Sequence, residues 1–280
     1  MISIGSAGGG RKRVGYAEVN GVRLWYETHG SGRPLVLLHG GFGAVETFAA
    51  IRPALAGRRQ VISVDLQGHG RTADVDRPLR YESMADDVAA LIVHLNLREA
   101  DVLGFSLGGG VALRMAIQHR RLLRRLVVVS APCRRQGWFS DVLAGMPEPA
   151  EAAGERMRGT PPEQLYQQVA PRPQDWPRLW AKTGELLRRE YDWSPEVATV
   201  TTPTLLVFAD ADSIRTGHMV EFFGLLGGGQ RDGAWDGAGR PASRLAVLPG
   251  LTHYDIVDSP ALPAAVLPFL THTLPSAPTP

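Results

Sequence analysis

Short apolar segments alternate with helical patterns along most of this chain, and this alternation restricts its possible folds more than any other feature. Six segments carry mostly Val, Leu and Ile without polar alternation, as is typical of strands buried on both faces: Leu35–Leu38, Val61–Val64, Asp101–Phe105, Leu126–Ser130, Thr204–Ala209 and Leu245–Leu248. Helical patterns lie between or after them, around Thr47–Leu55, Ser83–Leu95, Leu107–His119, Arg215–Leu226 and Ala261–Leu270. This order predicts an α/β fold with a mostly parallel central sheet flanked by helices.

One interval, residues 133–198, interrupts the alternation. Its 66 residues contain no strand candidate, and a plain loop of that length is uncommon in a compact domain. We therefore expect a helical cap, inserted into a core that comprises residues 14–132 and 199–272. Nine basic and ten acidic residues leave the interval nearly neutral, and it holds four of the six tryptophans: Trp138, Trp176, Trp180 and Trp193.

The N-terminal part of the chain contains a hairpin pattern. Val14–Val19 and Val22–Glu27 are extended segments on either side of Asn20-Gly21, a dipeptide that favours the tight turn of a β-hairpin. Residues 1–13 come before it, carry the basic triplet Arg11-Lys12-Arg13 and have no apolar signal-peptide core. We expect them to form a flexible, solvated tail.

Composition and charge exclude several classes of protein. Thirty basic residues against 28 acidic ones leave a formal net charge of +2, too small a surplus to indicate a nucleic-acid partner. No apolar run approaches the ~18 residues of a membrane helix, and the single cysteine, Cys133, can form neither an internal disulfide nor a cysteine metal cluster. The expectation is a cytoplasmic protein that binds neither a membrane nor nucleic acid.

The motif that carries chemistry is Gly104-Phe105-Ser106-Leu107-Gly108, which fits G-x-S-x-G. It stands between a predicted strand and a predicted helix, where a sharp turn exposes the serine hydroxyl and needs small residues two positions to either side. A serine that serves only as a helix N-cap in a glycine-rich turn is the plain alternative. The context favours Ser106 as a catalytic nucleophile.

A nucleophilic serine needs a base that is oriented by a carboxylate. Asp210 and Asp212 follow the strand candidate Thr204–Ala209, at the end of the strand where α/β folds place their ligands. His253 follows Leu245–Leu248. A single histidine on a loop is most simply a solvated side chain, but the three residue types occur in order and each lies just past a predicted buried strand.

An oxyanion-binding loop is the third expected part of the site. His39-Gly40-Gly41-Phe42-Gly43 directly follows the strand Leu35–Leu38, and its glycines allow backbone N–H groups to approach a developing alkoxide. We expect one donor from the N–H of Leu107 and a second from Gly41, with Phe42 as the rival for the second position. His39 is expected to hold this loop as a structural residue.

On these motifs the chain resembles the serine hydrolases of the α/β-hydrolase fold superfamily, over about residues 14–270. It is most similar to a capped group of carboxylesterases, cofactor-free haloperoxidase-like perhydrolases and C–C hydrolases. The resemblance implies that Ser106, Asp212 and His253 form a catalytic triad without metal or cofactor, and it favours Asp212 over Asp210 because the family's acid lies three positions after the residue that ends the strand. Ala209 and Thr252 stand where the family commonly has glycine.

Two other classes of function fit less well. Gly41-Phe42-Gly43 begins like a dinucleotide-binding fingerprint, but Glu46 occupies the last glycine position and would place a negative charge near a pyrophosphate. A non-catalytic binding protein on the same fold would not need all three triad residue types.

We therefore expect a hydrolase that cleaves a small or medium hydrophobic carboxylic ester, or a lactone, through an acyl-enzyme; C–C hydrolysis and perhydrolysis are the alternatives on the same fold. The pocket is expected to include Phe42, Trp138, Trp176 and Trp180. The sequence leaves the physiological substrate and the oligomeric state open.

Overall fold

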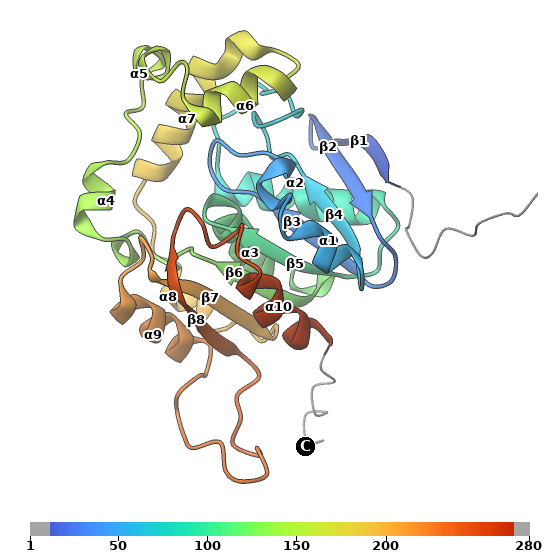
Figure 1. Ribbon diagram of the computed structural model, residues 1–280, viewed down its shortest axis with the longest axis vertical. Helices are drawn as coiled ribbons and strands as arrows, with labels where there is room; N and C mark the ends of the chain where they lie inside the picture. The colour runs from blue at the N-terminus through green and yellow to red at the C-terminus, as the bar shows by residue number, and fades with distance from the viewer. Residues whose placement is uncertain (1–11, 272–280) are drawn as a thin grey trace, which may run out of the picture.

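The computed structural model describes residues 12–271, which form one eight-stranded sheet covered by helices on both faces (Figure 1). The strands lie side by side in the order β1-β2-β4-β3-β5-β6-β7-β8. Their bounds are β1 Arg13–Val19, β2 Val22–His29, β3 Pro34–Leu38, β4 Gln60–Val64, β5 Ala100–Phe105, β6 Leu123–Val129, β7 Thr204–Ala211 and β8 Arg244–Thr252. The six strands from β4 to β8 along this order are parallel, and only β1 and β2 run antiparallel to their neighbours. This arrangement confirms the predicted α/β fold with a mostly parallel sheet.

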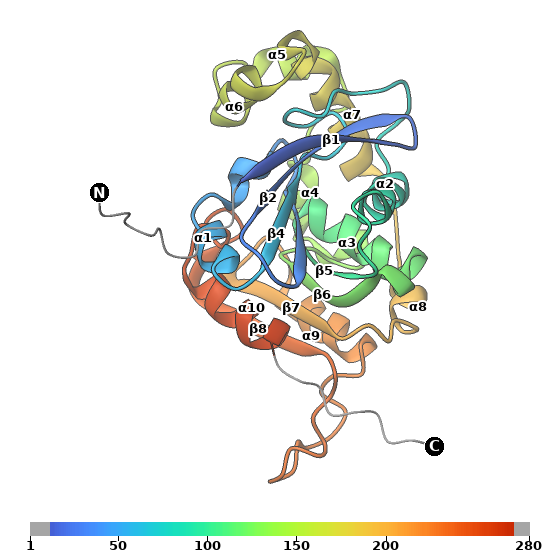
Figure 2. The same ribbon diagram turned by 90° about the vertical axis from the view of Figure 1, so that its right-hand side faces the viewer.

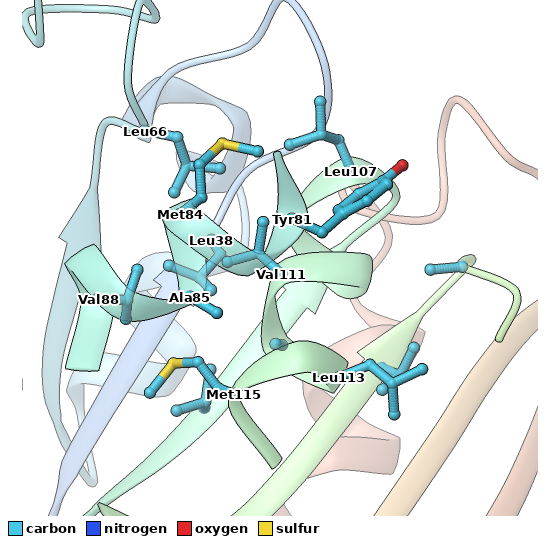
Figure 3. Close-up of a cluster of buried hydrophobic side chains, with 14 of the residues drawn as sticks. Leu38, Leu66, Tyr81, Met84, Ala85, Val88, Leu107, Val111, Leu113 and Met115 are labelled. Atoms are coloured by element: carbon cyan, nitrogen blue, oxygen red, sulfur yellow. The ribbon is translucent and has the colours of Figure 1, made fainter. Parts of the chain in front are cut away.

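Helices cover both faces of the sheet (Figure 2), and a cluster of buried apolar side chains fills the space on each face. On one face, α2 (Tyr81–His94), α3 (Leu107–Gln118) and α9 (Thr216–Leu225) contribute to the larger buried cluster. On the other face, α1 (Arg52–Ala56) and α10 (Ala261–Thr271) pack against the smaller one. Figure 3 shows how Met84 and Val88 from α2 meet Val111 and Met115 from α3. Strands β3 to β7 are buried on both sides, which explains why they show no polar alternation in the sequence. The expectation of a buried strand at Leu245–Leu248 is wrong in one respect: β8 forms the edge of the sheet, and Leu248 is its only buried residue.

The strands of the parallel core begin and end within three residues of the predicted segments, apart from the C-terminal extension of β8. Asn20 and Gly21 both have positive φ, 47° and 79°, as the tight turn of the hairpin requires. The helix expected around Thr47–Leu55 is instead a 3₁₀ turn, Val45–Phe48, followed by α1. Pro53 explains the interruption, because proline lacks an N–H group and is favoured in the first turn of a helix rather than in its interior.

The tail expected over residues 1–13 falls almost entirely outside the described residues. Arg13 differs from that expectation, because it opens β1 and pairs with Thr28 of β2. The side chain of Lys12 lies 2.9 Å from the carboxylate of Glu27.

The interval 133–198 contains short helices and no sheet strand among the elements of the structure. Its helices are α4 Ser140–Ala144, α5 Glu151–Arg156, α6 Pro161–Val169, α7 Trp176–Arg188 and α8 Ser194–Val197. We call residues 133–198 the inserted segment. In Figure 1, α5, α6 and α7 stand above the upper edge of the sheet, while α4 lies at the side. Lys182 of α7 donates to Asp74 and to two backbone carbonyls of the core, which fixes this helix to the loop after β4.

The connection between α9 and β8, residues 226–243, projects from the opposite end of the molecule (Figure 1). It is rich in glycine and carries a fully exposed tryptophan, Trp235. Within residues 12–271, no helix combines the length and the apolar character needed to cross a membrane.

Candidate active site

Ser106 stands at a sharp turn between β5 and α3. Its backbone has φ 53° and ψ −116°, a conformation that non-glycine residues rarely adopt. The turn brings two glycines into close contact: a Cβ on Gly104 would lie 2.0 Å from the carbonyl oxygen of Gly108, and a Cβ on Gly108 would lie 2.2 Å from that of Leu38. Both positions therefore exclude any larger residue, which is the physical reason for the G-x-S-x-G spacing.

The structure brings His253 to the hydroxyl of Ser106, although the two residues are 147 positions apart. The imidazole Nε2 lies 3.1 Å from Ser106 Oγ, within hydrogen-bond distance. His253 follows β8 directly and is buried against the ring of Phe105. In this geometry Nε2 can accept the hydroxyl proton when Nδ1 carries the hydrogen of the neutral ring.

Asp212 holds the other side of the imidazole. Its Oδ1 lies 3.0 Å from His253 Nδ1, and its Oδ2 accepts hydrogen bonds from Ser130 Oγ at 2.5 Å and from the N–H of Ala209 at 3.0 Å. Burial alone would raise the pKa of this carboxyl, but the contacts with His253, Ser130 and Ala209 outweigh it and hold the pKa below its usual range. The carboxylate is therefore ionised and fixed in orientation at neutral pH.

The neighbouring carboxylate, Asp210, has a different environment. It is exposed, and its Oδ1 accepts the N–H of Leu251 at 3.2 Å. Hydrogen bonds from backbone N–H groups, that of Gly250 first, lower its pKa. Asp210 thus braces the C-terminal part of β8 and, unlike Asp212, makes no contact with His253 among the hydrogen bonds of residues 12–271.

The loop after β3 runs beside Ser106. A Cβ built on Gly40 would lie 3.4 Å from Ser106 Cβ, and one built on Gly41 would lie 3.6 Å from Leu107 Cδ1. The N–H of Leu107 opens α3 and so has no acceptor within the helix. Gly41 and Leu107, the two expected oxyanion donors, are therefore adjacent. The rival residue, Phe42, has a positive φ of 60°.

His39 holds the loop after β3 in place through both nitrogens of its ring. Its Nδ1 lies 2.7 Å from the carbonyl oxygen of Gly40, and its Nε2 accepts the N–H of Leu66 at 3.1 Å. Burial, together with the nearby His69, lowers the pKa of His39 to about 3. A neutral ring that donates through one nitrogen and accepts through the other is fully used by these contacts, so His39 is structural.

A cavity of about 510 Å³ opens above Ser106 and His253. Of the four pocket residues expected from the sequence, Phe42 and Trp138 line it, and Trp138 packs edge-on against the His253 ring at 5.5 Å between centroids. Apolar residues of the inserted segment form much of the remaining wall. They are Val142 at α4, Met146 and Pro147 after it, and Leu187 of α7.

Trp176 and Trp180 do not line the cavity, contrary to the expectation. Trp176 is fully buried and donates through Nε1 to the carbonyl of Gly154, which joins α7 to α5. Trp180 stacks on Phe42 with 4.7 Å between ring centroids. The start of α7 instead packs against α5 and α6, where Trp176 contacts Gly154 and Tyr166. The rings of both tryptophans thus pack against the ring of Phe42.

Sequence reasoning missed the aliphatic part of the wall and one polar contact. Counting aromatic residues drew attention to the tryptophans, while Val142, Met146 and Leu187 carried no signal beyond their apolar character. Ser130 was visible only as the last residue of a strand candidate, and its contact with Asp212 depends on the pairing of β6 with β7. Within residues 12–271, no group of three or more His, Cys, Asp or Glu side chains is arranged to hold a metal ion.

Comparison with known proteins gives a family match over the region that contains Ser106. A family model described as the alpha/beta hydrolase fold matches residues 33–216. Among curated proteins, the dihydrolipoyllysine-residue acetyltransferase component of the acetoin cleaving system of Pseudomonas putida is 41% identical over 102 residues, which cover 36% of this chain and 28% of that protein. The soluble epoxide hydrolase of Corynebacterium sp. (strain C12) is 40% identical over 116 residues, 40% of each chain. The chain therefore spans less than half the length of these two relatives.

Solved structures match over nearly the whole chain. The enol-lactonase from Burkholderia xenovorans LB400 has a TM-score of 0.70 and 21% sequence identity, and the match covers 92% of this chain and 100% of that one. At this identity the likeness concerns the fold.

Proposed function

This chain belongs to the alpha/beta hydrolase fold family, and we propose that it hydrolyses a small or medium hydrophobic carboxylic ester, or a lactone, through an acyl-enzyme formed on Ser106. The observation that carries the proposal is the continuous hydrogen-bonded series from Ser106 Oγ through His253 to Asp212, with distances of 3.1 and 3.0 Å, at the floor of an apolar cavity. A serine hydroxyl becomes an effective nucleophile only with such a base and orienting acid.

The first half of the proposed reaction forms the acyl-enzyme. Ser106 Oγ attacks the carbonyl carbon while His253 Nε2 takes the hydroxyl proton. Asp212 keeps the imidazole in the tautomer with hydrogen on Nδ1 and stabilises the imidazolium. The N–H groups of Gly41 and Leu107 donate to the oxyanion, and each such donor stabilises the transition state by roughly 2.7–4 kcal/mol.

The second half returns the enzyme to its starting state. His253 gives its proton to the leaving alcohol as the C–O bond breaks, and the alcohol departs. A water molecule then attacks the acyl carbon while His253 takes one of its protons. When the tetrahedral intermediate collapses, His253 returns that proton to Ser106 Oγ and the carboxylic acid is released.

A fluorophosphonate probe tests the assignment of the nucleophile. The wild-type protein should be labelled at Ser106 at neutral pH, and Ser106→Ala should abolish labelling and lower kcat by several orders of magnitude, up to roughly 10⁶. Circular dichroism should show that the variant is folded, since alanine removes only the hydroxyl. Labelling that persists in Ser106→Ala would rule out the proposed nucleophile.

A substrate panel tests the proposed bond type. p-Nitrophenyl esters of graded acyl length should be hydrolysed in a manner that depends on Ser106, with an optimum at small or medium length because the cavity is about 510 Å³. Lactones and vinylogous diketones belong in the same panel. A clear preference for the diketones, whose cleavage breaks a C–C bond, would contradict the ester proposal.

A further inference from the structure

We propose that Asp141 is a specificity-determining residue, which makes this site favour esters whose alcohol part carries an alkylammonium group and disfavour those whose alcohol part carries a carboxylate. The inference rests on the proposed ester hydrolysis and adds the charge of the substrate. The observation behind it is the electrostatic composition of the cavity wall around Ser106.

Asp141 contributes an unpaired negative charge to that wall. It is exposed, lies in the first turn of α4 and lines the cavity together with Ser106 and His253. Among residues 12–271, no hydrogen bond or ion pair engages its carboxylate. A carboxylate without a protein partner is available to a cation from outside, at little desolvation cost because it already faces solvent.

The cavity wall provides no compensating positive charge. Neither lysine nor arginine is among its lining residues. The guanidinium of Arg188 binds the carbonyl oxygens of Met146 and Pro147 and lies outside the lining. Asp212, ionised behind His253, adds a second negative charge near the floor of the cavity. A carboxylate on the substrate would meet two negative charges here and no cation.

The position of Asp141 is fixed by the core. The N–H of Phe139 donates to the carbonyl of Ser213 at 3.1 Å, and that of Arg215 donates to the carbonyl of Gly137 at 2.9 Å. These bonds tie the chain just before α4 to the loop that carries Asp212. Asp141 is therefore held close to the triad.

The side of the cavity on which Asp141 lies points to the leaving alcohol. His253 Nε2 must protonate that alcohol, so the alcohol part of the substrate lies beside the imidazole. Trp138 packs against the same imidazole and is only three residues before Asp141. The wall on this side also includes the ring of Tyr254, and aromatic faces attract alkylammonium groups through cation–π interactions.

Three acetate esters of similar size test the proposal: acetylcholine, its uncharged isostere 3,3-dimethylbutyl acetate, and the acetate ester of 4-hydroxybutyrate. At low ionic strength kcat/KM should fall in that order, by about fivefold at each step, as expected for one exposed charge pair. Asp141→Asn should narrow the spread between the three values, because it removes one of the two negative charges near the substrate. Glu151→Gln is the matched control, because Glu151 is an exposed acidic residue in the first turn of α5 and does not line the cavity; it should keep the wild-type order.

Salt provides an independent readout, since screening at about 1 M reduces the range of the interaction to about 3 Å. The preference for acetylcholine should shrink with salt in the wild type and depend less on salt in Asp141→Asn. Equal kcat/KM values in the wild type, or unchanged ratios between the three esters in Asp141→Asn, would overturn the assignment of Asp141. If the proposed function itself is wrong, the result is different: the wild type shows no hydrolysis of the uncharged ester that depends on Ser106.

Discussion

Ser106 presents its hydroxyl to the cavity because its own backbone is held in an unfavourable conformation. A positive φ at a residue with a Cβ costs on the order of 1–3 kcal/mol, and β5 and α3 on either side impose it. The bond from the Gly108 N–H to the carbonyl of His39, at 3.0 Å, ties the same turn to the loop after β3. Ser106, the proposed nucleophile, and the two expected oxyanion donors are thus parts of one rigid unit.

A pair of isosteric substitutions distinguishes the two candidate acids. Asp212→Asn should lower kcat by about 10⁴, because an amide cannot stabilise the imidazolium and favours the wrong tautomer of His253. Asp210→Asn should change kcat little, since the carboxylate of Asp210 binds the backbone of β8 and not His253. Steady-state kinetics on one p-nitrophenyl ester measures both. A larger loss at position 210 would reverse the assignment.

The residues of the candidate triad could be predicted because each one follows a strand whose apolar pattern is visible in the sequence. Parallel strands bring their C-terminal ends to one edge of the sheet, so position along the chain translates into proximity. The walls of the cavity could not be predicted in this way. Whether Leu187 or Trp176 faces the substrate depends on how α7 packs on its neighbours, and helical spacing alone leaves that orientation open.

At the scale of single elements, the two ends of α7 make different contacts. Trp176, at the start, is buried among the rings of Phe42, Tyr166 and Trp180. Leu187, near the end, is half-buried and lines the cavity. The first contact stabilises the inserted segment, and the second limits the space for a substrate.

Alanine substitutions at these two positions should have separable effects. Trp176→Ala should lower the free energy of unfolding by about 3–5 kcal/mol, as expected for a large buried aromatic side chain, and change the relative kcat/KM for esters of different length less than Leu187→Ala does, because Trp176 reaches the cavity only through Phe42. Leu187→Ala should shift that profile towards longer acyl chains, because it enlarges the cavity, with a smaller loss of stability. Thermal melts and the p-nitrophenyl ester series provide the two measurements, and interchanged outcomes would refute this division of roles.

The bounds of the individual helices in the inserted segment could not be predicted from the sequence. A helical region was expected over residues 133–198, but its helices are short, between four and thirteen residues. Helices of one to three turns are marginal on their own and are formed mainly through tertiary contacts. Their individual bounds therefore depend on anchors such as Lys182, whose partners lie in a loop more than 100 residues earlier in the chain.

At the scale of the whole molecule, buried histidines couple the stability of the fold to pH. Burial lowers the pKa of His39 to about 3 and that of His69 to about 4, against about 6.5 in an unfolded chain. Between about pH 6.5 and these values, the unfolded state binds protons that the folded state does not. The contribution of these two histidines to the free energy of unfolding therefore decreases as the pH falls. Asp65 opposes the trend, because burial raises its pKa to about 6 and the folded state gains a proton there first.

The variant His69→Asn should make the acid-induced loss of stability shallower, by about 1.4 kcal/mol per pH unit between roughly pH 6 and 4. Urea titrations at half-unit intervals of pH would measure the slope. His94→Asn, at an exposed position in the last turn of α2, is the control and should keep the wild-type slope. The same slope in wild type and His69→Asn would show that His69 does not contribute.

The three residues of the proposed relay stand where β5, β7 and β8 end, whereas much of the apolar wall above them comes from the inserted segment. Replacements in that wall can alter which molecule fits without touching the proton transfers beneath it. Random change followed by selection could therefore explore new substrates while the chemistry is inherited intact. Substitutions in the inserted segment are therefore the ones expected to change specificity with the least loss of activity, both in evolution and in the laboratory.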